Sequence, residues 1–397
     1  MRRQPLLKIL LYIVVFTLSL GQFASIGGGE GFRLYLFDIF TTIFVFYGLI
    51  YFFIIKRSFK VPRNSFWFVG FVLIALLSWL IGLTTFSNLE AIVALFYLIR
   101  FLIYFLSSLI IFNMIQKKLI LPNDFFVLIF ISAAFISIVG FVQLAVLPDF
   151  TVLDSNLGWD PHKNRLASTF FDPNFTGGFL AMTLGLAIGL ILNKEIRLTP
   201  LQLVFFVVIP LIALVLTFSR SSWGMFAVII LVLGMLRARW LLFLAAILMF
   251  LTYFAIPRVQ TRLSGVTDPA DSAAFRLVSW KNTMVIAKDN PILGVGFNYF
   301  RYAQREYGFF DVGTQGGHAG SGSDSSLLLI LATTGVIGTT LFGLGYLTST
   351  ANLFSVNRIA LFAVLLGLLL HSQFVNSLFY PQIMFLWLSF ISFYSNL

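Results

Sequence analysis

The chain has 397 residues, of which 59% are hydrophobic and only 10% are charged. A soluble domain carries about a quarter charged residues, so this composition and a mean hydropathy of +0.97 exclude a soluble globular protein. The net charge of +11 does not imply nucleic acid, because most basic residues of a membrane protein mark its topology. The sequence has no cysteine, which excludes disulfide and thiolate chemistry.

Apolar runs recur along the chain at roughly the 20-residue length that a spanning helix needs. A backbone in lipid must satisfy its own hydrogen bonds, so we expect an all-α, polytopic membrane protein. The apolar start at Leu6 lacks a convincing cleavage site, and we interpret it as a retained helix rather than a signal peptide. About twelve spans are predicted, near 7–26, 34–55, 66–86, 91–113, 124–147, 174–193, 199–218, 221–236, 240–257, 324–346, 359–378 and 380–396.

The distribution of Lys and Arg predicts the orientation of these helices. With a cytoplasmic N-terminus, the inner loops carry most of the basic residues, as the positive-inside rule requires. The short outer loops carry only Arg33, Lys163, Arg165 and Arg220. Both termini are then cytoplasmic, and the 148–173 loop and the 257–323 segment face outward.

The sequence divides into four parts. Residues 1–147 hold the first five helices, 148–256 hold an outer loop and helices six to nine, and 324–397 hold the last three. Residues 257–323, called the polar segment below, form the one long polar stretch and are the predicted catalytic loop. Within the polar segment, the apolar spacing of 272–288 predicts an amphipathic helix, followed by a turn or helix stop at 289–291.

Four stretches in this order are similar to a known family. They are Arg165-Leu-Ala-Ser-Thr-Phe-Phe-Asp-Pro-Asn174, Thr217-Phe-Ser-Arg220-Ser-Ser-Trp223, Arg276-x-x-x-Trp280 with the later Asn290-Pro-Ile-Leu-Gly-Val-Gly-Phe, and His318 with the later Asp324-Ser-Ser-Leu-Leu. The chain resembles the O-antigen ligase and polymerase superfamily, bacterial membrane enzymes of surface polysaccharide assembly. Ligases of that family often carry a His-Asn pair where this chain reads Gly320-Ser-Gly-Ser-Asp324, which favours a polymerase.

The resemblance implies a GT-C-like glycosyltransferase of the bacterial inner membrane with its active site on the outer, periplasmic face. Its donor would be a glycan on undecaprenyl pyrophosphate, and its acceptor another glycan or a lipid A–core sugar. Chain-length regulators or flippases would be partners, no cofactor is expected, and the product would be O-antigen, capsule or exopolysaccharide. The three histidines are far apart in sequence and make no recognisable metal-binding pattern.

Breaking a sugar–phosphate bond builds negative charge on the pyrophosphate, which an arginine fork can bind bidentately. We expect Arg220 to do this at the end of a span, with Arg165 and Arg276 beside it. Arg100, in the middle of the fourth span, would contact the phosphates, sit in a lateral groove or pair with Asp38. His318 is the predicted general base, with an unperturbed pKa near 6.5.

Each of these residues also has a plainer interpretation. Arg220 could anchor a helix end in the headgroups, Arg165 could pair with a nearby carboxylate, and Arg276 and His318 could simply face solvent. His371 is expected to hydrogen-bond between helices rather than to catalyse. The aromatic residues predicted to stack on sugars are Trp159, Trp280, Tyr299 and Tyr302.

Two other classes of function fit the composition. A polysaccharide-lipid transporter or flippase often has twelve spans, but such proteins usually show internal repeats and broken helices near the midplane. The sequence shows no repeat between its halves. A non-catalytic assembly protein is the third hypothesis, and tolerance of substitutions at Arg220 and His318 would favour it.

Overall fold

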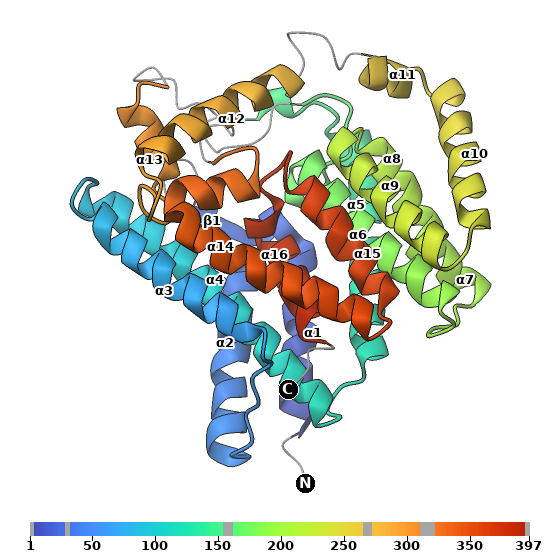
Figure 1. Cartoon of the computed structure of the whole chain (residues 1–397). Helices are drawn as coiled ribbons and strands as arrows, with labels where there is room; N and C mark the ends of the chain where they lie inside the picture. Colours follow the sequence, from blue (N-terminus) through green and yellow to red (C-terminus); the bar gives the residue numbers. More distant parts are fainter. Residues whose placement is uncertain (1–3, 28–31, 154–161, 265–271, 310–321, 394–397) are drawn as a thin grey trace.

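The protein is built almost entirely from helices (Figure 1). The computed structural model describes residues 4–27, 32–153, 162–264, 272–309 and 322–393. In these ranges the strands are short: β1 (Ser25–Gly27) pairs antiparallel with β2 (Arg33–Tyr35). The all-α membrane fold predicted from hydropathy is confirmed.

The N-terminal third is a layer of long helices whose ends carry clear sequence signals. Ser87 accepts a hydrogen bond from the backbone N–H of Glu90, whose carboxylate accepts one from Ser87 N–H, so the two residues form a capping box. Pro122 occupies the first turn of the next helix, where no N–H is needed. The elements are α1 (Gln4–Leu20), η1 (Gly21–Ala24), α2 (Leu36–Leu49), its continuation η2 (Ile50–Ile55), α3 (Ser65–Gly82), α4 (Asn88–Gln116) and α5 (Pro122–Val146).

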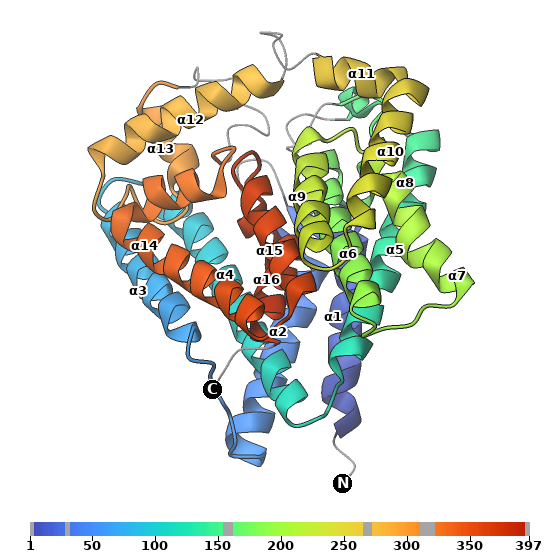
Figure 2. The same ribbon diagram turned by 45° about the vertical axis from the view of Figure 1, so that its right-hand side comes forward.

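Two helices of the middle third lie side by side with one from the end of the chain (Figure 2). α6, α9 and α15 pack pairwise, and Gly189 lets α6 approach α15, because a Cβ there would lie 2.5 Å from Ala360 Cβ. The elements before the polar segment are η3 (Phe150–Val152), η5 (Ser168–Phe170), α6 (Pro173–Leu192), α7 (Pro200–Leu203), η6 (Val204–Val208), α8 (Ile209–Leu216), α9 (Arg220–Leu236) and α10 (Trp240–Ala255).

The described parts of the polar segment form three helices at one end of the bundle, opposite the end at which α1 begins (Figures 1 and 2). They are α11 (Pro257–Ser264), α12 (Ser272–Asp289) and α13 (Phe300–Glu306). A helix at 272–288 is thus confirmed, and it stops before Pro291 as expected, but its apolar side chains do not gather on one face as predicted. The chain ends with α14 (Ser326–Ser355), α15 (Ile359–His371), η9 (Ser377–Phe379) and α16 (Pro381–Ser392).

α14 is broken in its middle, and the break receives part of the polar segment. Gly335 has φ +63° and ψ −167° inside the helix, a conformation that essentially only glycine adopts. Val336 N–H donates to Pro291 O at 2.9 Å, and Val295 N–H donates to Ala332 O at 2.9 Å. The loop between α12 and α13 is therefore hydrogen-bonded into a helix that is apolar enough to cross a membrane.

The twelve predicted spans correspond to apolar helices of different lengths. Among the described residues, seven helices are long and apolar enough to cross a membrane, or eight if α10 and α11, bent by 101°, are one span. The four remaining stretches are shorter apolar helices, Pro200–Leu216, Arg220–Leu236, Ile359–His371 and Pro381–Ser392. A 12-residue helix such as α16 is only about 18 Å long, whereas the hydrocarbon core is about 30 Å thick. Apolar runs that contain turns were predicted as single helices.

Candidate functional site

Two family-like motifs meet at the ends of α6 and α9. Arg165 is 8% exposed, and its Nε donates to Thr217 O at 2.9 Å while a terminal nitrogen donates to Asn174 Oδ1 at 3.2 Å. The first motif therefore contacts the second directly, although about fifty residues separate them. Arg165 is fixed between the entry to α6 and the turn before α9.

Local capping chemistry builds this junction. Asp172 caps α6 by accepting from Asn174 N–H at 2.6 Å, and Ser219 caps α9 by accepting from Ser222 N–H. The Ser219 hydroxyl also donates to Asn174 Oδ1 at 2.8 Å. Asn174 Oδ1 thus accepts from both Arg165 and Ser219, which uses both of its lone pairs.

The loop that leads to Arg165 is held at its base. Asp149 and Lys163 form an ion pair at 2.9 Å, and Phe150 N–H donates to His162 O at 2.9 Å. Hydrogen bonds from Thr151 and Lys163 lower the pKa of Asp149 to about 2, so its carboxylate is charged at neutral pH. The tip of this loop, with Trp159, lies outside the described residues.

Arg220 is the first residue of α9 and is partly exposed. Its Nη1 donates to the backbone oxygen of Arg262 on α11 at 3.2 Å. The sharp bend between α10 and α11 therefore brings α11 over the motif turn. The partial positive charge at the N-terminus of α9 adds to that of the guanidinium.

Two further arginines gather at this place, and sequence reasoning missed them. Arg258 lies with its guanidinium carbon 4.6 Å from the Phe218 ring centroid and donates to the backbone oxygens of Asn164 and Lys163. Arg258 and Arg262 are four residues apart, so they share one face of α11. That spacing in Pro257–Ser264 was the signal that could have identified them.

The polar segment brings Arg276 and Trp280 toward the same end of the bundle. Arg276 on α12 is partly buried and acts electrostatically on the ring of His371 at the end of α15. The Trp280 ring lies 5.7 Å from the ring of Phe374, and its buried indole N–H has no hydrogen-bond partner in the described structure. Trp280 therefore retains a donor that a sugar hydroxyl could satisfy, and its sugar-binding role stays a prediction.

Tyr299 and Tyr302 lie in a buried cluster rather than on an open surface. Tyr299 is 0% exposed and stacks on Phe86 with ring centroids 4.6 Å apart. Burial raises the pKa of Tyr299 to about 12, so its hydroxyl is neutral. Tyr302 is 6% exposed. These positions favour a packing role for both tyrosines over the predicted stacking on sugars.

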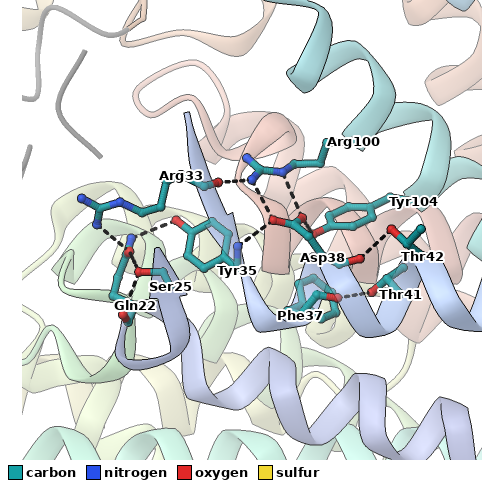
Figure 3. Close-up of polar contacts among 10 residues, drawn as sticks. All are labelled: Gln22, Ser25, Arg33, Tyr35, Phe37, Asp38, Thr41, Thr42, Arg100 and Tyr104. Atoms are coloured by element: carbon teal, nitrogen blue, oxygen red, sulfur yellow. Dashed lines mark hydrogen bonds and ion pairs between the residues drawn. The ribbon is translucent and has the colours of Figure 1, made fainter. Parts of the chain in front are cut away.

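Arg100 is paired within the membrane-spanning part (Figure 3). Its guanidinium forms an ion pair with Asp38 at 2.7 Å and also donates to the backbone oxygen of Arg33. Tyr104 donates its hydroxyl to the same carboxylate at 2.6 Å. Arg100 also borders a cavity of about 240 Å³ between α2 and α4. The structure thus shows the pairing with Asp38 that the sequence analysis named as an alternative, and it gives no support to phosphate binding by Arg100.

The predicted base, His318, lies outside the described residues. The chain resumes beside α12, where Ser323 accepts a hydrogen bond from Thr283 at 3.0 Å and Asp324 N–H donates to Ser279 at 3.1 Å. The part of the chain that the structure describes contains no group of three or more His, Cys, Asp or Glu arranged to hold a metal ion.

The fold and this junction define a polytopic membrane protein with arginines converging at one end of its bundle. A family model described as O-antigen ligase matches residues 205–343. The match supports the resemblance of this chain to the O-antigen ligase and polymerase superfamily. The match includes Arg220, Arg276 and Trp280, whereas Arg165 and His371 lie outside it. No curated protein matches the chain.

Proposed function

We propose that this protein is a membrane glycosyltransferase that moves a glycan from an undecaprenyl-pyrophosphate donor to a sugar hydroxyl during surface polysaccharide assembly. The observation that carries the proposal is the convergence of Arg165, Arg220, Arg258 and Arg262 at the capped ends of α6 and α9. The O-antigen ligase match over residues 205–343 supports the reaction type.

The reaction needs charge stabilisation more than covalent help from the protein. The acceptor hydroxyl oxygen attacks the anomeric carbon, and the bond from that carbon to the phosphate oxygen breaks with its electron pair left on the pyrophosphate. Arginine forks aimed at those oxygens stabilise the charge that develops. Arg220 has this role in our proposal, with Arg165 and Arg276 as further phosphate ligands, so the transfer requires no divalent metal.

The proton of the acceptor hydroxyl goes to His318 in this proposal, since an imidazole with an ordinary pKa near 6.5 is available as a base at neutral pH. The reaction takes place at the outer, periplasmic face of the bacterial inner membrane, with both termini in the cytoplasm. The asymmetry of basic residues between the loops supports this orientation.

We propose a polymerase rather than a ligase, so the acceptor is a second lipid-linked repeat unit. The sequence Gly320-Ser-Gly-Ser-Asp324, which replaces the His-Asn pair frequent in ligases of the family, supports this choice. Chain-length regulators and flippases are the proposed protein partners.

The test is transfer in proteoliposomes supplied with pyrophosphate-linked oligosaccharide from the native host and with EDTA. Wild type should form longer lipid-linked chains. We expect Arg220→Ala to lose at least about 10²-fold in kcat/KM, as removal of one charge-stabilising donor typically does. Arg220→Lys should recover only part of this loss, because an ammonium lacks the bidentate fork.

Arg239→Ala is the matched control, because Arg239 is an exposed arginine just beyond the other end of α9. It should transfer like wild type. Product that forms only after addition of lipid A–core would identify a ligase. Translocation of the donor without transfer would overturn the enzyme proposal and support a flippase.

A further inference from the structure

His371 ends α15 inside the bundle, far along the chain from the arginine motifs. Its side chain is 0% exposed, and its Nε2 lies 3.3 Å from the Ser222 hydroxyl in the first turns of α9. A Cβ on Gly178 of α6 would lie 2.9 Å from His371 Cε1. The ring is therefore held where α6, α9 and α15 meet, directly behind the capped junction that holds Arg165.

A series of hydrogen bonds runs from His371 through neighbouring hydroxyls to Arg165. Ser222 Oγ lies 3.0 Å from Ser219 Oγ and 3.1 Å from the backbone oxygen of Asn174. Ser219 donates to Asn174 Oδ1 at 2.8 Å, and the same oxygen accepts from Arg165. A side chain on α15 is thus connected to a guanidinium of the site through two serines and one asparagine.

The number of hydroxyl hydrogens and the tautomer of His371 together decide which atoms donate in this series of hydrogen bonds. The one hydroxyl hydrogen of Ser219 goes to Asn174 Oδ1, and that of Ser222 can go to Ser219 or to the Asn174 carbonyl. In the tautomer that carries its hydrogen on Nε2, His371 donates to Ser222 Oγ. His371 Nδ1, which is buried and has no hydrogen-bond partner in the described structure, is left as a bare acceptor, whereas the other tautomer would bury an unpaired N–H donor.

We infer that His371 is a positioning residue of the glycosyl-transfer site. Its Nε2–H holds Ser222, and through Ser219 and Asn174 it sets the orientation of the Arg165 guanidinium toward the pyrophosphate. This inference rests on the proposed function. It makes His371 part of the donor site although it touches no reacting atom.

The test compares substitutions of His371 by Gln and by Asn, two amide side chains that differ in length. Gln places its amide nitrogen about where His places Nε2, so His371→Gln retains the donor to Ser222, whereas the shorter Asn does not reach it. We expect His371→Asn and His371→Leu to raise the donor KM and lower kcat/KM by about 10- to 100-fold, the scale of a small misplacement of a binding group. His371→Gln should restore most of the loss.

Tyr346→Phe controls for the simple loss of a buried hydrogen bond to α15, because Tyr346 donates to Leu365 O at 2.8 Å and is 2% exposed. It should lower the unfolding temperature without changing the donor KM. Asn174→Ala already interrupts the series of hydrogen bonds between His371 and Arg165. In that background His371→Leu should therefore have no further effect on the donor KM. A fully additive effect would assign His371 to stability alone and overturn the inference.

A second measurement separates this inference from the proposed function. Undecaprenyl pyrophosphate should raise the unfolding temperature of wild type and of His371→Gln, but much less that of His371→Leu. Active wild type with equally active His371→Leu and His371→Asn would overturn the inference and leave the function standing. Wild type that neither transfers glycan nor responds to the lipid would overturn the proposed function, and the inference with it.

Discussion

Arg100 and Arg165 are both buried arginines, but they have different hydrogen-bonding partners. Arg100 faces a carboxylate at 2.7 Å, which neutralises its charge within the bundle. Arg165 donates to the Thr217 backbone oxygen and to the Asn174 side chain, which hold it at the junction of α6 and α9. The sequence places Arg100 in the middle of an apolar run and Asp38 near the end of another, so the two residues look poorly matched in depth. α4 has 29 residues, more than a span needs, so a position along that run does not give a depth in the bilayer.

Arg100→Ala should destabilise the protein by about 3–5 kcal/mol, because it leaves the carboxylate of Asp38 buried without its cation. The quantity to measure is the free energy of unfolding in detergent. Arg100→Ala combined with Asp38→Asn should recover part of the loss, since no unpaired charge then remains. If Arg100→Ala has normal stability but fails to bind undecaprenyl pyrophosphate, Arg100 would instead be a donor-binding residue.

The element that the sequence could not reveal is the broken helix α14. Residues 326–355 are apolar throughout, and nothing in their hydropathy indicates that Gly335 leaves the helical region. The reason lies elsewhere in the chain: a Cβ on Gly335 would lie 2.1 Å from Ile292 O, and one on Gly294 would lie 2.3 Å from Thr333 C. The two backbones approach too closely for side chains, so both positions require glycine.

Gly335→Ala should therefore destabilise the protein by several kcal/mol, because it adds backbone strain of about 1–3 kcal/mol to a clash with the loop that enters the break. Gly343→Ala, in the same helix, meets nothing within 4 Å and should be neutral or stabilising by up to about 1 kcal/mol. Unfolding in detergent measures both. Equal stability of the two variants would mean that the loop does not need the break.

At the scale of the whole molecule, hydropathy predicted the fold class and the approximate position of every apolar helix, because both depend on local composition. It did not show which apolar runs form the shorter helices, since composition does not show where a turn interrupts an apolar run. The junction of Arg165 with the Arg220 turn followed from motif resemblance. The roles of Arg258, Arg262 and His371 depend on which helices become neighbours, and no local pattern contains that information.

The absence of cysteine makes the proposed orientation directly testable with single-cysteine variants. Val152, at 70% exposure, follows α5 in the predicted outer loop, and Leu121, at 58% exposure, precedes α5 beside Lys117 and Lys118. In intact bacterial spheroplasts, a membrane-impermeant maleimide should label Val152→Cys and not Leu121→Cys. Inverted vesicles should give the opposite pattern. The same label pattern in both preparations would contradict the topology.

The hydrogen bonds around the α14 break also set an order of events during synthesis. The Ser78 hydroxyl on α3 lies 2.7 Å from Leu293 O and 2.6 Å from Thr333 O, partners that follow it by 215 and 255 residues. A ribosome that adds 5–20 residues per second needs roughly 10–40 s to reach the first of them. Until then, the Ser78 hydroxyl of α3 cannot form these two hydrogen bonds. The end of the bundle that holds the proposed site is completed only after α14 emerges, so a chain truncated before α14 should lack an assembled site.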